Sequence, residues 1–488
     1  MTTPMPPSSG LRGFLVSIGS LISARAFVAV SQLMVLPILA RQITVEEFGL
    51  MGLAMTVVIF ANTLSDGGLG RSLIRTRDAD IVEWSSVSWV MVGVGLAFTL
   101  LICAISPLAA RYFDSPAIVP ILLVMSVVPL LQAVAAAPNA EIERREHYAG
   151  IARIEVASTL AGLAAAVIGA LAGFGIWALV AQQILLAGVR TAGTLWMSQF
   201  RPVLAFSTAS LRPHLIYARD TIAASVVTVA RDQLPIVMIS RVLGQIPLGY
   251  FTMSARFTRL PQFGLAGPMA SVVYVRMSKA QHSPEKLRDL YYASMRLLSA
   301  LLIPTCAVIA VASQPIFATF LSPEWKPTAP VFVLSVGGIV LESIAIYFLN
   351  PLFRAISRTD LVLRLTVEGV VLRLVLVFGA VFMGLEAVAA SLTIWALIMV
   401  PRNWQIGARH VPITFAGCLA TFVPSLISAG IFSGAYLTLN TLWQISDAMN
   451  MGLATVLGLS GVGLTLLIDH QRTRAALGAF RAEPAPAE

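Results

Sequence analysis

The chain has 488 residues, of which 57% are hydrophobic and only 12% are charged, and its net charge is +9. About a quarter of the residues of soluble domains are charged, so this composition excludes a soluble globular protein and indicates a polytopic membrane protein. The positive charges lie in short loops between apolar segments, which excludes nucleic acid as a partner.

The chain begins with residues 1–13, a segment rich in Pro, Ser and Thr that we expect to be disordered and cytoplasmic. The apolar run that follows, from Phe14 to Ala40, is too long for the apolar region of a signal peptide and ends without a small-residue cleavage pattern. We therefore expect it to remain as the first membrane helix.

The rest of the chain continues as a series of apolar segments. A helix that crosses a hydrocarbon core of about 30 Å needs roughly 20 mostly apolar residues. This criterion predicts an all-α polytopic membrane protein with about fourteen transmembrane helices. The expected spans are residues 14–40, 48–66, 84–105, 117–137, 154–173, 176–198, 214–240, 248–274, 291–313, 328–350, 363–383, 385–406, 413–439 and 451–468.

Lys and Arg concentrate in the loops that follow even-numbered spans, so both termini should be cytoplasmic, with residues 469–488 as a cytoplasmic tail. An internal repeat organises the spans. Its members are Leu36-Pro37-Ile38, Arg41 and Phe48-Gly49-Leu50, matched by Leu234-Pro235-Ile236, Arg241 and Leu248-Gly249-Tyr250.

The repeat predicts two pseudo-symmetric six-helix lobes, an N-lobe at residues 14–200 and a C-lobe at residues 214–406. Because six is an even number, both lobes should have the same orientation, around a central cavity near the membrane midplane. Residues 413–468 would add two helices, the thirteenth and fourteenth, outside the repeat.

The spans at 214–240 and 248–274 carry charges that a membrane helix should avoid. A charge near the bilayer centre costs roughly 2.5 to 3.5 kcal/mol, so it should face protein or a wet cavity. Asp220 and Arg231 are eleven residues apart and share a helix face. Two interpretations are open. In the first, Asp220 with Arg231, or Asp232 with a neighbour, forms a neutralising pair that holds helices together. In the second, several arginines line an aqueous cavity and meet an anionic substrate.

Arginine suits phosphate because its planar fork donates bidentate hydrogen bonds and stays charged. Arg190 and Arg259 could equally extend to the membrane interface, and Gln32 shares a face with Arg25. Our hypothesis for the residues that bind pyrophosphate or sugar is therefore Arg25, Arg231, Arg256, Arg259, Arg190 and Gln32. The candidates for ion coupling or gating are Asp66, Asp220 and Asp232.

Other polar residues do not form a recognisable reactive group. Glu368 is expected to pair with Arg364 or with Arg373. The three cysteines share no short spacing, and the five histidines include no pair at metal-ligand spacing. We therefore expect no catalytic residues, no metal and no cofactor.

Four short motifs stand out, at Ala40–Leu50 (ARQITVEEFGL), Ser65–Gly70 (SDGGLG), Gly175–Gln182 (GIWALVAQ) and Leu243–Tyr250 (LGQIPLGY). Together they resemble the Wzx-type polysaccharide flippases of the multidrug/oligosaccharidyl-lipid/polysaccharide exporter superfamily, over about Arg12 to Arg402. The resemblance implies a bacterial inner-membrane transporter, not an enzyme. It would translocate undecaprenyl-pyrophosphate-linked oligosaccharide to the periplasmic leaflet by alternating access of its lobes.

The resemblance also implies membrane lipids as partners, and polysaccharide polymerase and chain-length machinery as further candidates. The chain ends after the fourteenth expected span, without the extra lipid-groove helices that we expect of lipid II flippases, which argues against a peptidoglycan precursor. Two alternatives stay open: an exporter of small amphiphilic compounds, and a membrane polymerase or glycosyltransferase that acts on the same lipid carrier.

Overall fold

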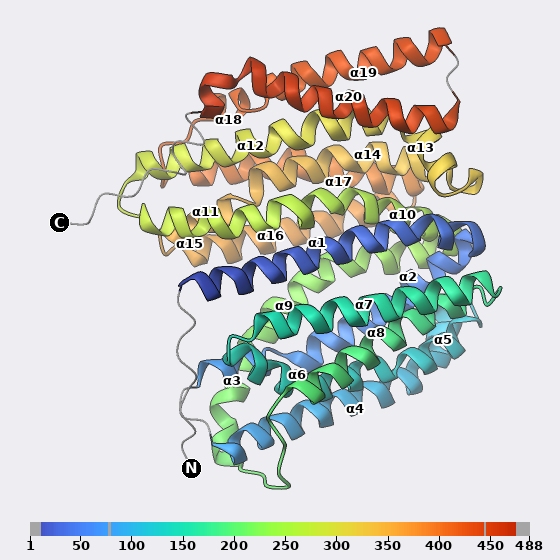
Figure 1. The fold of residues 1–488 in the computed structure, drawn as a ribbon, viewed down its shortest axis with the longest axis vertical. Helices are drawn as coiled ribbons and strands as arrows, with labels where there is room; N and C mark the ends of the chain where they lie inside the picture. The colour runs from blue at the N-terminus through green and yellow to red at the C-terminus, as the bar shows by residue number, and fades with distance from the viewer. Residues whose placement is uncertain (1–10, 77–79, 444–445, 475–488) are drawn as a thin grey trace. The chain divides into compact units, whose positions relative to one another are not determined.

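The computed structural model describes residues 11–76, 80–443 and 446–474, and within these ranges every regular element is a helix. The all-α prediction is therefore confirmed. The chain divides into two compact units, Met1–Gln245 and Ile246–Glu488, and Figure 1 colours them from blue to green and from green to red.

In the first unit, α7 packs between α1 and α8, α4 packs on α6, and α2 packs on α9 (Figure 1). The helices of this unit are α1 (Leu11–Gln42), α2 (Val45–Asp66), α3 (Leu69–Arg75), α4 (Ile81–Tyr112), α5 (Ile118–Met125), α6 (Val127–Arg144), α7 (Tyr148–Leu171), α8 (Ile176–Met197) and α9 (Thr208–Leu243).

In the second unit, α17 packs against α14 and α16, whereas α19 and α20 pack on each other and on α12. The helices of this unit are α10 (Gln245–Pro261), the π-helix η1 (Gln262–Ala266), α11 (Gly267–Lys279), α12 (Pro284–Val311), α13 (Ser313–Phe320), the 3₁₀-helix η2 (Pro323–Trp325), α14 (Thr328–Leu341), the π-helix η3 (Glu342–Ile346), α15 (Leu349–Ala355), α16 (Thr359–Val381), α17 (Leu385–Gly407), α18 (Phe415–Ala420), α19 (Val423–Trp443) and α20 (Asp447–Ile468).

The described residues contain eleven helices long and apolar enough to cross a membrane. The other three expected spans also fall on helices: α1, α10 with α11, and α16. The α10–α11 segment is interrupted by η1, and α16 carries four charged residues. The number of fourteen spans therefore stays a prediction.

The boundary between the two units follows α9 because this helix packs on α2, α3 and α4 of the first unit. The sequence-based division instead assigned the span at 214–240 to the second lobe. The six-helix lobes and their symmetry stay predictions, and most of the expected disordered N-terminus and cytoplasmic tail lies outside the described residues.

The Glu47 carboxylate caps the N-termini of two helices in the first unit, α2 and α8. Glu47 Oε2 accepts a hydrogen bond from Thr44 N (2.9 Å), which completes a capping box at the start of α2. Glu47 Oε1 accepts a hydrogen bond from Ile176 N (2.9 Å), the first residue of α8. Gly175 lies in the left-handed region (φ +54°), and a Cβ there would collide with this carboxylate. Two of the four sequence motifs therefore meet at Glu47.

Glu47→Ala is expected to destabilise the first unit by about 2 kcal/mol, because hydrogen bonds to charged groups contribute roughly 1.5 to 3 kcal/mol. The measurement is thermal unfolding of the purified protein in detergent. Glu46→Ala is the matched control, since Glu46 is an exposed residue of the same first helical turn and should change stability by no more than about 0.5 kcal/mol. Equal melting temperatures for the two variants would contradict this role of Glu47.

The double glycine after α2 brings this helix close to α9. Gly67 and Gly68 both have positive φ (+48° and +75°), which favours glycine. A Cβ on Gly68 would lie 2.6 Å from Thr221 Cγ2, so only glycine lets the two segments approach so closely. The second motif thus positions α9, which carries several of the candidate site residues.

Candidate functional site

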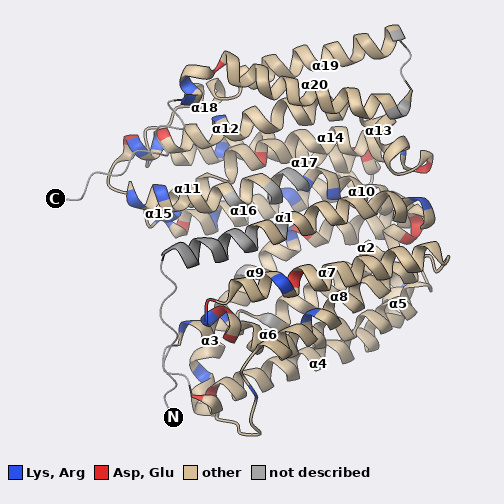
Figure 2. Ribbon diagram, in the orientation of Figure 1, with Lys and Arg blue, Asp and Glu red and all other residues tan. Residues whose placement is uncertain are grey.

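The charged residues are unevenly distributed along the helices. Figure 2 shows that most positions along the helices are uncharged, and that many Lys, Arg, Asp and Glu residues lie toward helix ends. Charges within the apolar stretches of α1, α8, α9, α10 and α16 are the exceptions that the sequence analysis singled out.

On α9, Arg231 Nε lies 3.3 Å from Asp232 Oδ1. Both side chains are half-buried, with 27% and 23% of their surface exposed. The structure thus brings together one candidate phosphate ligand and one candidate coupling acid. The side chain of Asp220, the other proposed partner of Arg231, lies outside the described part of the chain.

A buried hydrogen bond fixes α9 beside this pair. Thr56 Oγ1 on α2 donates to Gln233 Oε1 on α9 (2.9 Å), and both residues are buried. Two residues correspond to about 200° around an α-helix, so Arg231 points away from the face that Gln233 turns toward α2. Sequence reasoning missed Thr56 and Gln233, because neither residue is charged and their separation of 177 residues gives no local pattern.

On α10, Arg256 is exposed and Arg259 is half-buried, just before the π-helix η1. Ser254 and Thr258 on the same helix are buried, and each lies about 200° from Arg256. Arg256 therefore projects from the side opposite the packed face. Single-turn π-helices are frequent at functional sites, which makes this end of α10 a candidate ligand-binding region.

The remaining candidates lie on other helices of the first unit. Gln32 on α1 and Arg190 on α8 are exposed, and both helices pack on α7. The side chains of Arg25 and Asp66 lie outside the described residues. Since Arg256 and Arg259 belong to the second unit, the convergence of all candidates on one cavity stays a prediction.

The acidic and basic residues of α16 have specific partners in the second unit. Glu368 Oε1 lies 2.8 Å from Arg364 Nε, as expected, and its other oxygen lies 3.3 Å from Arg402 Nε on α17. The alternative pairing of Glu368 with Arg373 is wrong. Arg373 instead lies 3.9 Å from Glu342, the first residue of η3, and both side chains are more than 90% buried.

An aromatic ring stabilises the buried arginine further. The Arg373 guanidinium lies 4.9 Å from the centroid of the Trp395 ring, a cation–π distance. Trp395 Nε1 donates to the carbonyl oxygen of Gly369 (2.7 Å), which fixes the ring between α16 and α17. Sequence reasoning recognised the charge of Arg373 but not its partners Glu342 and Trp395, because these contacts join different helices.

A second buried polar chain lies where α9 begins. His214 Nδ1 lies 2.6 Å from Ser72 Oγ on α3, and His214 Nε2 lies 2.7 Å from Glu83 Oε1 on α4. His214 is 1% exposed, so the chain is closed to solvent at its centre. These contacts join α3, α4 and α9, and the buried Ser72 is not presented as a nucleophile.

His214→Ala is expected to lower the stability of the first unit by roughly 1 to 3 kcal/mol, because Ser72 and Glu83 would each lose a buried partner. Thermal unfolding in detergent measures the change. His282→Ala is the control, because His282 is exposed in a loop. The assigned role of His214 is wrong if both variants unfold at the wild-type temperature.

The eleven long apolar helices, in a chain whose described elements are all helical, define a multi-pass membrane protein. A model of the family described as "Polysaccharide biosynthesis protein" matches residues 38–330, more than half of the chain. The chain belongs to this family.

Relatives with curated descriptions agree with this family. The chain is 26% identical over 337 residues to the lipopolysaccharide biosynthesis protein WzxC of Escherichia coli K12, covering 66% of each chain. It is 26% identical over 298 residues to the succinoglycan biosynthesis transport protein ExoT of Rhizobium meliloti, covering 61% of this chain. The chain thus spans only 66% and 60% of the lengths of these two relatives.

Solved structures identify the fold. The lipid II flippase MurJ in an inward closed conformation superposes with a TM-score of 0.74, at 15% identity, over 92% of this chain and 99% of its own. An inward-facing multidrug transporter of the MATE family superposes with a TM-score of 0.62, at 15% identity, over 78% of this chain and 94% of its own. The expectation that lipid II flippases have extra helices is wrong, because almost all of MurJ is matched.

Proposed function

We propose that this protein is a flippase that moves undecaprenyl-pyrophosphate-linked oligosaccharide repeat units from the cytoplasmic to the periplasmic leaflet of the bacterial inner membrane. The observation that carries this proposal is the family match over residues 38–330, on a chain whose fold resembles a lipid flippase. The names of two relatives, a lipopolysaccharide biosynthesis protein and a succinoglycan transport protein, favour an exported polysaccharide.

The proposed orientation places both termini in the cytoplasm, because Lys and Arg are concentrated in the loops on that side. Transport would proceed by alternating access of two lobes, with polysaccharide polymerase and chain-length machinery as downstream partners. The substrate class rests on the family and not on the number of helices, because the fold is shared with a lipid II flippase.

In the proposed site, Arg231 and Arg256 bind the pyrophosphate together with Arg25, and Arg190, Arg259 and Gln32 contact phosphate or sugar. The Arg231–Asp232 contact of 3.3 Å supports a proposal for how substrate binding changes the site. A phosphate oxygen and the Asp232 carboxylate would compete for the same guanidinium, so binding of the lipid would displace Asp232. Asp232, with Asp66 and Asp220, is our candidate for ion coupling or gating.

The deciding experiment measures undecaprenyl-linked repeat units in membranes of a deletion strain, with a sugar-modifying enzyme added on the periplasmic side. Complete units that accumulate and stay inaccessible to the enzyme would support the flippase. Truncated units would point instead to a glycosyltransferase, and complete, accessible units to a polymerase. An unchanged pool would favour the exporter of small amphiphilic compounds, for which the same strain should be hypersensitive to drugs.

A further inference from the structure

The connection between α8 and α9 exposes apolar side chains to an unusual degree. Leu204 is 95% exposed, Phe206 is 56% exposed, and Trp196, in the last turn of α8, is 82% exposed. Residues 198–207 of this connection are not helical. Such a segment needs partners for the polar groups of its backbone and an apolar environment for its exposed side chains.

The connection is held firmly along α4. Trp89 Nε1 donates to the carbonyl oxygen of Val203 (2.9 Å), and Val203 N donates to Ser85 Oγ (3.0 Å). Ser207 N donates to Ser86 Oγ (2.8 Å). The outward direction of the apolar side chains is therefore set by a fixed backbone.

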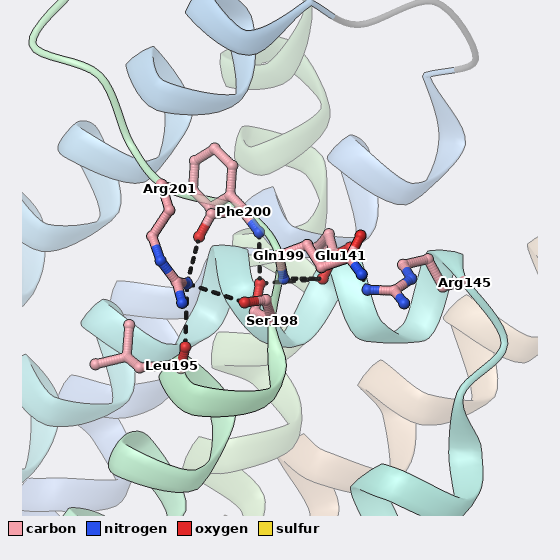
Figure 3. A network of polar contacts seen from close by, with 7 residues as sticks. All are labelled: Glu141, Arg145, Leu195, Ser198, Gln199, Phe200 and Arg201. Carbon is pink, nitrogen blue, oxygen red and sulfur yellow. Dashed lines mark hydrogen bonds and ion pairs between the residues drawn. The ribbon is translucent and has the colours of Figure 1, made fainter. Parts of the chain in front are cut away.

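The beginning of the connection is tied to α6. Glu141 Oε2 accepts hydrogen bonds from Ser198 Oγ (3.0 Å) and Gln199 N (3.3 Å), and its other oxygen accepts one from Arg145 (3.1 Å; Figure 3). The same carboxylate thus orients two residues of the connection and is itself held by a cation.

Arg201 closes the end of α8. Its Nη1 lies within hydrogen-bonding distance of the carbonyl oxygens of Leu195 (3.1 Å), Ser198 (2.9 Å) and Phe200 (3.0 Å; Figure 3). The last carbonyl groups of a helix lack intrahelical partners, and polar backbone groups must be satisfied before a segment can enter a lipid boundary. Arg201, Glu141 and the serines of α4 satisfy backbone groups at both ends of the connection.

The length of α4 gives the depth of the connection. α4 has 32 residues and is therefore about 48 Å long, whereas the hydrocarbon core is about 30 Å thick. A centred helix would extend roughly 9 Å beyond the core at each end. Ser85 and Trp89 lie about 6 and 12 Å from its start at Ile81, so the contacts with the connection fall at the boundary between hydrocarbon and headgroups.

We propose that residues 195–206 form an interfacial anchor that inserts Trp196, Leu204 and Phe206 into the membrane boundary. Trp favours this depth because its ring is apolar and its N–H is polar. Arg201 in the connection and Arg212 in the first turns of α9 are both exposed, and such cations attract anionic headgroups. The occupant is the cytoplasmic leaflet in the proposed orientation. Exposed apolar residues continue from the connection along α4 and α8, at Leu96, Leu100, Leu185 and Leu195.

The test places an environment-sensitive fluorophore on Leu204→Cys, in a background where Cys103, Cys306 and Cys418 are replaced by Ala. The full-length protein is reconstituted in vesicles of phosphatidylethanolamine and phosphatidylglycerol. His282→Cys is the matched control, since His282 lies in an exposed loop expected on the same side of the membrane. We expect the label at position 204 to emit at shorter wavelength, to be quenched by nitroxide lipids and to be shielded from iodide.

A second measurement uses the native residue and needs no label. Brominated lipids should quench less of the total tryptophan emission in Trp196→Phe than in the wild type. Iodide quenching at position 204 equal to that at position 282, in protein that elutes as one species from detergent, would overturn the proposal. It would assign this surface to water or to a protein partner. Neither readout depends on which molecule is transported.

Discussion

Charge reversal at Arg231 or Arg256 is expected to reduce polysaccharide export by about 10- to 100-fold. The reason is that a hydrogen bond to a charged group contributes roughly 1.5 to 3 kcal/mol, and 1.4 kcal/mol corresponds to a tenfold change in binding. The measurement is export in the deletion strain complemented with Arg231→Glu or Arg256→Glu, normalised to the amount of protein in the membrane.

Two control variants distinguish the loss of a positive charge at the site from a general effect of charge reversal on the protein. Arg409→Glu makes the same change at an exposed residue after α17 and should leave export unchanged. Arg231→Lys keeps the charge but loses the planar fork, so it should recover part of the activity. Export at the level of Arg409→Glu, with normal protein amounts, would remove Arg231 and Arg256 from the proposed site without affecting the assignment of the family.

Arg373→Met is expected to destabilise the second unit by about 3 to 5 kcal/mol, because it leaves the Glu342 carboxylate buried without this cation. The double variant Glu342→Gln/Arg373→Met should recover much of the loss, since replacing a buried ion pair by neutral groups is often tolerated. Thermal unfolding in detergent measures both changes.

The control for Arg373 lies on the same helix. The Arg364 side chain is 61% exposed and pairs with Glu368, and an exposed pair contributes only about 0 to 1 kcal/mol. Arg364→Ala should therefore unfold close to the wild type. If Arg373→Met is as stable as Arg364→Ala, the Glu342–Arg373 contact does not stabilise this unit.

The sequence predicted the features that local patterns determine. Long apolar runs indicated the helices, and the Arg364–Glu368 pair follows from a spacing of four residues. The apolar pattern did not establish the number of membrane spans, because α10 with η1 and α16 combine apolar residues with charges or breaks.

The contacts that assemble each unit could not be predicted in this way. Thr56 with Gln233, and Arg373 with Glu342, pair across different helices, and their partners depend on how those helices pack. The candidate site is an intermediate case. Its charged residues were recognisable because they break an apolar pattern, whereas the contact of Arg231 with its neighbour Asp232 was only one of two open alternatives.

The Glu47 carboxylate also bears on how the protein is made. Its donor, Ile176 N, is 129 residues further along the chain, so at 5 to 20 residues per second the ribosome needs roughly 6 to 26 s to deliver it. By the end of that interval the ribosome has synthesised α2 to α7, but the N-terminus of α8, which Glu47 caps, does not yet exist. A pause in translation or a truncation before residue 175 should therefore leave an incompletely packed intermediate, which is a substrate for membrane quality control.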